Sequence, residues 1–395
     1  MRSQMVLLAC VALLVAGAIV TAGNLNPPAG PVSPTMKSLD EIEPRIAISA
    51  TNTPGDANNQ FRISQPGSYY LTGNITGVSG KTCIRIATSG VTLDLNGFTL
   101  EGVTGSLSGI YSQSVRSTIR NGTIRNFNVG IDAYEAAGVR IQDMSCTNAA
   151  NQNFRASVGA IIENCFSEYG TVGFDVFETA TLTACVSRYA SLYGFEVEGG
   201  CALTNCTAVT AQIGFYVRGP SVLTNCTSQS NSIDGFRADE SSIFTDCTAF
   251  DNDSAGFYGI ARCRFTRCNS RNNQYGFFLT EANAVVECTA TANFSNGVRI
   301  GGNANSVEHS TCHENGAAGI NIATGVANSI DSNLLTYNGT SGLFITTGDN
   351  ISTRNRARGN ANGNYTFGGN NEYGVILTNP GAGFTSSSAW ANFSY

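Results

Sequence analysis

The sequence predicts an all-β solenoid, a right-handed parallel β-helix of about 14 coils with an N-terminal cap. Three observations lead to this prediction. A glycine followed by an apolar residue recurs every 20 to 23 residues from Gly173 to Gly342. A cysteine recurs every 19 to 21 residues from Cys146 to Cys288. Only 13% of the residues are charged, and Gly, Asn, Ser and Thr are frequent, which is typical of short strands and turns.

The coil from Gly214 to Ile233 shows how the period is used. Because strand side chains alternate between two faces, we expect Phe215 and Val217 to point inward, and Tyr216 and Arg218 outward. The first inward position predicts an aromatic column six residues deep: Phe174, Phe195, Phe215, Phe236, Phe257 and Phe277. A second inward position follows the next turn and recurs as Leu182, Leu203, Leu223, Phe244, Phe265 and Val285, with His309 expected to occupy it in the later coil.

Asparagine recurs four residues before most of these glycines. Asparagine accepts left-handed turn geometry, and stacked asparagines can hydrogen-bond to one another along the coil axis. We therefore expect a ladder made by Asn231, Asn252, Asn272, Asn293, Asn315 and Asn338.

The rival solenoid is the leucine-rich repeat, which shares the period and a column of Asn or Cys. Its strand requires three leucines at set spacing, whereas leucine is sparse here and the intervening residues are Asn, Ser, Thr and Gly. The parallel β-helix is therefore favoured, and crossovers between parallel strands favour the right hand.

The cysteines are expected to be buried once per coil. Neighbouring coils lie about 4.8 Å apart, a Cα separation that a disulfide tolerates, but the parallel side chains favour a ladder of free thiols. A local disulfide stays open as the alternative for two pairs, Cys201 with Cys206 and Cys263 with Cys268.

The chain divides into five expected segments. Residues 1–22 form a signal peptide, 23–44 a Pro-rich linker, 45–80 the N-terminal cap, 81–378 the β-helix and 379–395 a C-terminal tail or cap. The signal predicts a protein that is secreted, periplasmic or on the cell surface, with no membrane span once the signal is removed. An uncleaved anchor is the alternative. The net charge of −6 disfavours nucleic acid as a partner.

The repeat resembles that of a known superfamily. Its unit, Ile/Leu-x-Asn-Cys-Thr-Ala followed by Asn-x-x-x-Gly-Phe/Ile-x-Val, is similar to the parallel β-helix repeat of pectin-lyase-like proteins, and Val91–Gly97 resembles their opening coils. Gly55-Asp56, Gly73-Asn74-Ile75-Thr76 and the closing Trp390–Tyr395 resemble secreted members from planctomycete-type bacteria. The resemblance implies the fold but no single activity, since members include lyases, hydrolases, epimerases and proteins without an assigned reaction.

Candidate functional residues follow the Gly-Phe pairs on the outward side of one strand. Aromatic rings can stack on pyranoses, guanidinium groups bind carboxylates, and carboxylic acids transfer protons. The predicted carbohydrate-binding residues are Tyr216, Tyr258, Phe278, Asp239 and Arg299. The predicted role is binding of an extracellular or envelope polysaccharide, or a structural surface role.

The alternative function is an enzyme that acts on an acidic polysaccharide, as a lyase, glycoside hydrolase or epimerase. Asp175, Glu196 or Glu198 would then be the acid or base, because carboxylates on adjacent coils have separations that glycosidases use. Arg218 or Arg237 would neutralise a uronate. The resemblance to lyases of this fold implies that one of these arginines could also serve as the base.

No dedicated metal centre is predicted. Asp251-Asn252-Asp253 could hold Ca²⁺, but the segment lacks the glycine and distal glutamate of an EF-hand loop. His309, Cys312 and His313 form a cluster whose spacing matches no zinc pattern.

Overall fold

The computed structural model describes residues 44–378 and 386–395. The predicted signal peptide and all of the predicted linker except Pro44 lie outside the described residues. The chain divides into two units, Met1–Pro44 and Arg45–Tyr395, and the second unit holds every described strand. The described part of the chain contains no helix long and apolar enough to cross a membrane.

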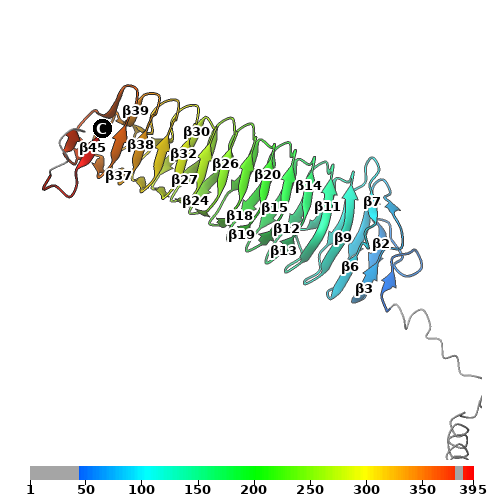
Figure 1. The fold of residues 1–395 in the computed structure, drawn as a ribbon. Coiled ribbons are helices and arrows are strands. Elements are labelled where there is room, and N and C mark those ends of the chain that lie inside the picture. Colours follow the sequence, from blue (N-terminus) through cyan, green and yellow to red (C-terminus); the bar gives the residue numbers. More distant parts are fainter. Residues whose placement is uncertain (1–43, 379–385) are drawn as a thin grey trace, which may run out of the picture. The chain divides into compact units, whose positions relative to one another are not determined.

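The second unit is a stack of coils built from parallel strands (Figure 1). Each regular coil contributes one strand to sheet B and two short strands to sheet A, as β21, β22 and β23 do. Sheet B has 15 strands, one more than the number of coils predicted. They are β2 (Asn59–Ile63), β5 (Thr82–Ile86), β8 (Ser108–Ser112), β10 (Val129–Ala133), β12 (Gln152–Ala156), β15 (Val172–Phe177), β18 (Tyr193–Glu198), β21 (Ile213–Val217), β24 (Phe236–Glu240), β27 (Ala255–Ala261), β30 (Tyr275–Glu281), β33 (Val298–Gly301), β36 (Ile320–Thr324), β39 (Ser341–Ile345) and β42 (Gly363–Phe367).

Sheet A has 30 strands in two rows. The first row is β1 (Ile46–Ala47), β3 (Gly67–Tyr70), β6 (Val91–Asp94), β9 (Thr118–Arg125), β11 (Arg140–Thr147), β13 (Ile161–Glu163), β16 (Thr181–Thr183), β19 (Ala202–Thr204), β22 (Val222–Thr224), β25 (Ile243–Thr245), β28 (Arg264–Thr266), β31 (Ala284–Val286), β34 (Ser306–Glu308), β37 (Ser329–Asp331), β40 (Ile351–Thr353) and β43 (Glu372–Tyr373). The second row shares β9 and β11 and continues with β4 (Ile75–Thr76), β7 (Thr99–Glu101), β14 (Phe166–Glu168), β17 (Val186–Arg188), β20 (Thr207–Val209), β23 (Thr227–Gln229), β26 (Thr248–Phe250), β29 (Asn269–Arg271), β32 (Thr289–Thr291), β35 (Thr311–His313), β38 (Leu334–Thr336), β41 (Arg356–Arg358), β44 (Ile376–Thr378) and β45 (Asn392–Ser394).

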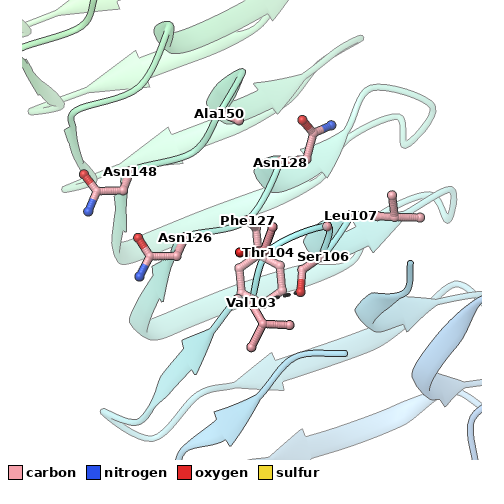
Figure 2. Close-up of a pocket in the computed structure, with 11 residues that line it drawn as sticks. Val103, Thr104, Ser106, Leu107, Asn126, Phe127, Asn128, Asn148 and Ala150 are labelled. Carbon is pink, nitrogen blue, oxygen red and sulfur yellow. Dashed lines mark hydrogen bonds between the residues drawn. The ribbon is translucent and has the colours of Figure 1, made fainter. Parts of the chain in front are cut away.

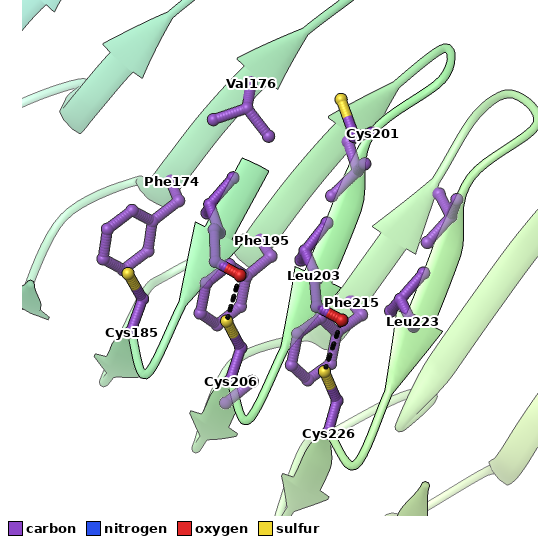
Figure 3. Close-up of a cluster of buried hydrophobic side chains, with 14 of the residues drawn as sticks. Phe174, Val176, Cys185, Phe195, Cys201, Leu203, Cys206, Phe215, Leu223 and Cys226 are labelled. Carbon is purple, nitrogen blue, oxygen red and sulfur yellow. Dashed lines mark hydrogen bonds between the residues drawn. The ribbon is translucent and has the colours of Figure 1, made fainter. Parts of the chain in front are cut away.

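The aromatic column is confirmed and is one residue longer than predicted. Phe154 of β12 stacks on Phe174, with ring centroids 4.7 Å apart, and the column continues to Phe277 at separations of 4.6 to 5.0 Å. Figure 3 shows Phe174, Phe195 and Phe215 following one another from coil to coil in this column. Sequence-equivalent side chains therefore stack directly, and the buried rings form the centre of the core.

The second inward position is confirmed for the leucine column but not for His309. Val285 pairs in register with Val307, so Val307 fills the inward position. His309 instead lies at the corner between β34 and β35, where its φ is 51°. This is the left-handed corner that Asn205, Asn225 and their equivalents make in earlier coils, and a polar residue at a turn does not need a place in the core.

All twelve cysteines of the described residues are buried free thiols, Cys201, Cys206, Cys263 and Cys268 among them. Eight of them, those from Cys165 to Cys288 other than Cys201, donate an Sγ hydrogen bond to a carbonyl of the preceding coil. Cys226 Sγ, for example, lies 3.6 Å from the Leu203 oxygen (Figure 3). Cys146 was wrongly placed in this column. It pairs in register with Ser167, two residues beyond the column, because β11 aligns Met144 rather than Cys146 with Cys165.

An asparagine ladder runs through the buried corner before sheet B. Asn231 Nδ2 donates to Asn252 Oδ1 at 2.7 Å, and the pattern repeats through Asn338 to Asn360. The predicted member Asn272 is wrong: Asn273 occupies the ladder, and Asn272 is an outward turn residue with φ 54°. The cause is a turn before Gly276 that is one residue shorter than in neighbouring coils.

The two ends of the unit differ. Residues 45–80, the predicted N-terminal cap, form the first coil, since β2 and β3 pair in parallel with β5 and β6. The segment before β2 runs along its outer edge through an antiparallel bridge between Pro54 and Phe61. At the other end, β45 of the predicted tail pairs in parallel with β41 and β44. Residues 379–385 of that tail lie outside the described residues.

Candidate functional site on the outer face of sheet B

The predicted outward column is a continuous row of register partners on sheet B. We call this set the outer row: Arg85, Tyr111, Asp132, Arg155, Asp175, Glu196, Tyr216, Arg237, Tyr258, Phe278, Arg299 and Asn321. The row exists because each member follows the inward apolar residue of its strand, so strand alternation turns it outward. The structure thus brings Asp175 through Arg299 together as the sequence predicted.

Glu196 of the outer row and Glu198, two residues further along β18, share one arginine. Arg218 Nη1 donates to Glu198 Oε1 at 2.8 Å, and Arg218 Nη2 forms a salt bridge with Glu196 Oε1. The guanidinium also lies over the Tyr216 ring, with its Cζ 4.9 Å from the centroid. Burial raises the pKa of Glu196, while Arg218 opposes that rise and the charge of Glu198 adds to it. The charge of Arg218 is therefore already balanced within the protein.

Asp175 is the most buried carboxylate of the outer row, with 4% of its surface exposed. Gln152 Nε2 donates to its Oδ2 at 3.3 Å, and Arg155 Nε lies 3.5 Å from the same oxygen. Its other oxygen, Oδ1, is buried and has no hydrogen-bond partner. Burial and the repulsion of Glu196 raise the pKa of Asp175 to about 7, against the attraction of Arg155. A sizeable fraction of Asp175 is therefore protonated at neutral pH.

The aromatic part of the row is a four-layer stack. The Tyr258 and Phe278 rings stack with centroids 4.9 Å apart and 12° between their planes. Arg237 Cζ lies 5.0 Å from the centre of the Tyr258 ring, and Arg299 Cζ lies 5.4 Å from that of Phe278. Both faces of each ring are thus covered by protein. The prediction that a sugar stacks on the faces of Tyr258 and Phe278 does not fit this geometry, which leaves ring edges and guanidinium groups for a ligand.

The remaining polar residues of the site have distinct partners. The Tyr216 hydroxyl donates to Asp239 Oδ2 at 3.2 Å, so this predicted pair is joined. Arg237 lies 3.8 Å from the buried carboxylate of Asp234. Arg299 Nη1 donates to the Tyr275 hydroxyl at 3.3 Å, and Arg299 forms no salt bridge with any carboxylate in the described chain.

Unpartnered buried polar atoms concentrate on the outer row. Among the described residues, eight buried side-chain N or O atoms have no hydrogen-bond partner, and six of them belong to the row: Arg85 Nε, Arg155 Nε, Asp175 Oδ1, Arg237 Nε, Arg299 Nε and Asn321 Oδ1. Buried polar groups are normally hydrogen-bonded. Buried polar atoms that lack a hydrogen bond are therefore concentrated on this row, beneath its exposed groups.

Sequence reasoning missed four residues that shape the site: Arg155, Asp234, Tyr193 and Tyr275. Arg155 belongs to β12, where Asn153 replaces the glycine that marks later coils, so its Phe154-Arg155 pair was not recognised as a copy. The other three precede the glycine of their strands and also face outward. Counting back 20 residues from Asp175 would have found Arg155.

A cavity away from the outer row has few groups that could bind or react with a ligand. It has a volume of about 820 Å³ and is lined by residues 102–107, 126–128, 148 and 150 (Figure 2). No lining side chain is charged, and two of its three asparagines are committed: Asn126 donates to Glu101, and Asn128 accepts from Asn151.

No group of three or more His, Cys, Asp or Glu residues that could hold a metal ion occurs among the described residues. In the segment considered for Ca²⁺, the amide of Asn252 is used by the buried ladder, and Asp251 accepts from Asn272. His313 bonds to Thr336, whereas Cys312 is buried in the core.

Comparison with known proteins agrees with the observed fold over the C-terminal third of the chain. Residues 257–393 match the family model described as "Right handed beta helix region". The chain folds as a right-handed parallel β-helix. No curated protein sequence matches it.

Several solved structures are similar to this β-helix protein. The A-module of mannuronan C-5 epimerase AlgE4 from Azotobacter vinelandii is 13% identical, with a TM-score of 0.34 and coverage of 78% of this chain and 86% of that one. A double mutant of the periplasmic alginate epimerase AlgG is 12% identical, with a TM-score of 0.42 and coverage of 90% and 82%. Tailspike protein 3 of bacteriophage CBA120 is 12% identical, with a TM-score of 0.47 and coverage of 81% and 64%.

Proposed function

We propose that this protein binds an extended, acidic polysaccharide outside the cytoplasm, without covalent change, along the outer row between β21 and β33. The observation that carries the proposal is the stack Arg237–Tyr258–Phe278–Arg299, in which two guanidinium groups enclose two rings. Arg299 has no carboxylate partner in the described chain, so its charge is available to an anionic ligand.

The spacing of the arginines favours a polymer over a small anion. Arg237 and Arg299 are three coils apart, which is about 14 Å at the usual distance between strands. One carboxylate cannot contact both groups, whereas a chain of uronic acids laid along the coil axis can. Because the rings hold the guanidinium groups in place, less side-chain entropy is lost on binding.

The shape of this face favours binding over turnover. The connections that leave sheet B along this stretch are short, namely residues 218–221, 241–242, 262–263 and 282–283, and no long loop borders this part of the row among the described residues. Enzymes commonly exclude water from the reacting groups. An open face bordered by tight turns suits prolonged contact with a long chain.

A second candidate function is catalysis at the acidic part of the row. A carboxyl group with a raised pKa beside an ionised carboxylate is a common acid and base arrangement, and Asp175 and Glu196 are register partners. Asp175 would act as the acid and Glu196 as the base, with Arg155 and Arg218 next to a uronate. Against this, Glu196 is already held by Arg218.

One experiment separates the two functions. The purified protein is incubated with a panel of neutral and uronic-acid polymers, and both retention on immobilised glycan and release of reducing or unsaturated ends are followed. Retention on acidic glycans without products supports binding. Products that disappear in Glu196→Gln and in Asp175→Asn support the enzyme, and neither retention nor products would refute both functions.

A further inference from the structure

A second cavity lies at the C-terminal end of the β-helix, far along the chain from the outer row's stack. Its volume is about 450 Å³, within the range of small-molecule sites. Its side-chain lining comes mainly from Ile351, Thr353, Glu372, Tyr373, Val375 and Trp390. Trp390 and Tyr373 are 56% and 51% exposed, so two large aromatic side chains face solvent at one pocket.

Each of these two rings is supported by the protein on one side. Arg354 Cζ lies 5.0 Å from the centre of the Trp390 ring. The Tyr373 ring stacks on Phe367, with centroids 4.3 Å apart. No second aromatic or cationic side chain of the described residues lies over either ring. In contrast to Tyr258 and Phe278, both rings therefore keep a face for a ligand.

Trp390 is fixed in position by its neighbours. The Arg354 amide donates to the Trp390 carbonyl at 3.3 Å, and Asn392, two residues on, accepts from Asn355 at 3.2 Å. A Cβ atom at Gly374 would lie 1.7 Å from the Trp390 carbonyl oxygen, so only glycine permits this approach. The pocket is thus formed before any ligand arrives.

The charges around the pocket disfavour an anion. Glu372 is the only charged side chain in the lining. Arg354, beneath Trp390, is neutralised by Asp331, with Arg354 Nε donating to Asp331 Oδ1 at 2.8 Å. A carboxylate and a threonine hydroxyl beside exposed rings can accept hydrogen bonds from sugar hydroxyls while the rings contact an apolar pyranose face.

We propose that this pocket is a second glycan site, which takes a neutral pyranose unit through Trp390 and Tyr373. It is separate from the outer row, and it binds an uncharged sugar whereas the outer row binds an acidic one. A protein with both sites could attach at once to an acidic polymer and to a neutral one, and the two attachments would reinforce each other.

The single tryptophan of the chain makes this site directly observable. Tryptophan emission of the full protein is measured while neutral tetrasaccharides of glucose, mannose and galactose, and a uronic-acid tetrasaccharide, are added in turn. We expect a saturable change with at least one neutral sugar. Tyr373→Ala should weaken that binding about tenfold, whereas Tyr189→Ala, which removes an exposed, stacked tyrosine elsewhere, should leave it unchanged.

A second variant keeps the test decisive if Tyr373→Ala does not fold. Glu372 is exposed, so Glu372→Lys should fold and should increase affinity for the uronic-acid tetrasaccharide several-fold relative to the neutral sugar. The proposal is overturned if no neutral sugar alters the emission, if the uronic acid binds better to the unaltered protein, or if Tyr373→Ala binds normally. It is also overturned if the emission changes with protein concentration alone and sedimentation shows a dimer, since a second copy would then cover the pocket.

Discussion

Arg299 lies over the ring of Phe278, with 5.4 Å between its guanidinium carbon and the ring centroid. The same guanidinium donates to the Tyr275 hydroxyl and lies 5.3 Å from the centre of that ring. Two aromatic side chains therefore hold a permanently charged group, without a carboxylate, at one end of the proposed binding surface. This relationship is the basis of the first prediction.

Replacing Arg299 should weaken retention on an acidic glycan. Arg299→Gln should lower the affinity about tenfold or more, because a hydrogen bond to a charged group contributes roughly 1.5–3 kcal/mol. Arg299→Lys should recover only part of it, since a lysine lacks the planar fork that binds a carboxylate with two hydrogen bonds. Affinity electrophoresis in gels containing a polyuronate measures both. The control is Arg267→Gln, whose arginine is paired with Asp246 at the turns between the two rows of sheet A. An equal loss in the control would contradict the prediction.

Asp175 should make the protein less stable as the pH rises. Its pKa is about 7 in the folded protein and near 4 in an unfolded chain, so the folded state holds the extra proton between these values. The contribution of Asp175 to the free energy of unfolding is therefore fully present below about pH 4. It is lost as the pH rises through 7, a change on the order of 4 kcal/mol. Asp175→Asn should remove this decline, so the variant gains stability relative to the unaltered protein between pH 5 and pH 8.

Urea unfolding at pH 5 and pH 8 tests the sign of this change in stability with pH. Asp246 serves as the control because the hydrogen bond from Arg267 lowers its pKa, so both states are ionised throughout this window. Asp246→Asn should therefore change stability equally at both pH values. If Asp175→Asn also behaved in this way, the raised pKa of Asp175 would be excluded.

Substitutions at Asn273 and at Asn272 should differ in their effect on stability, because only Asn273 belongs to the ladder. Asn273→Ala removes buried hydrogen bonds to Asn252, Asn293 and Ser270 and should destabilise the protein by about 3 kcal/mol or more. Asn272→Gly should have little effect, because glycine accepts the left-handed backbone and Asn272 bonds only to the exposed Asp251. Urea unfolding curves give the free energy of unfolding of each variant. An equal loss in the two variants would contradict the assignment of Asn273 to the ladder.

The thiols of the core should be protected until the protein unfolds. Burial raises the pKa of Cys83 to about 12 and that of Cys201 to about 11, which suppresses the reactive thiolate. A disulfide-exchange reagent should react with almost none of the twelve cysteines in the native protein and with all of them in denaturant. Fewer than twelve reactive thiols in denaturant without reductant would show that some are paired.

The fold could be predicted because stacked coils repeat the same side chain at the same place. Phe195, Phe215 and Phe236 recur in the sequence and touch in the structure for one reason, the register of sheet B. The failures occur where turn length changes. A turn shorter by one residue transferred the ladder from Asn272 to Asn273, and a spacing of 19 residues made Cys146 resemble a member of a column whose place Met144 fills.

The site could be predicted only as far as strand alternation determines it. Alternation places Tyr258, Phe278 and Arg299 on one face, but side-chain rotamers decide that the arginines cover the rings. The unusual environment of Asp175 depends on Arg155 and Gln152, which lie 20 and 23 residues earlier in a coil without the marker glycine. Such contacts between coils cannot be predicted from the residues next to Asp175 in the sequence.

The dependence of affinity on ligand length tests the central claim most directly. Calorimetric titration with uronic-acid oligomers from one to six units compares the unaltered protein with Arg299→Gln. We predict weak binding of the shortest oligomers and a clear rise once the oligomer spans the roughly 14 Å between Arg237 and Arg299, with no such rise in the variant. Equal affinity at every length, or a rise that Arg299→Gln retains, would contradict the proposed binding of a polymer along the outer row.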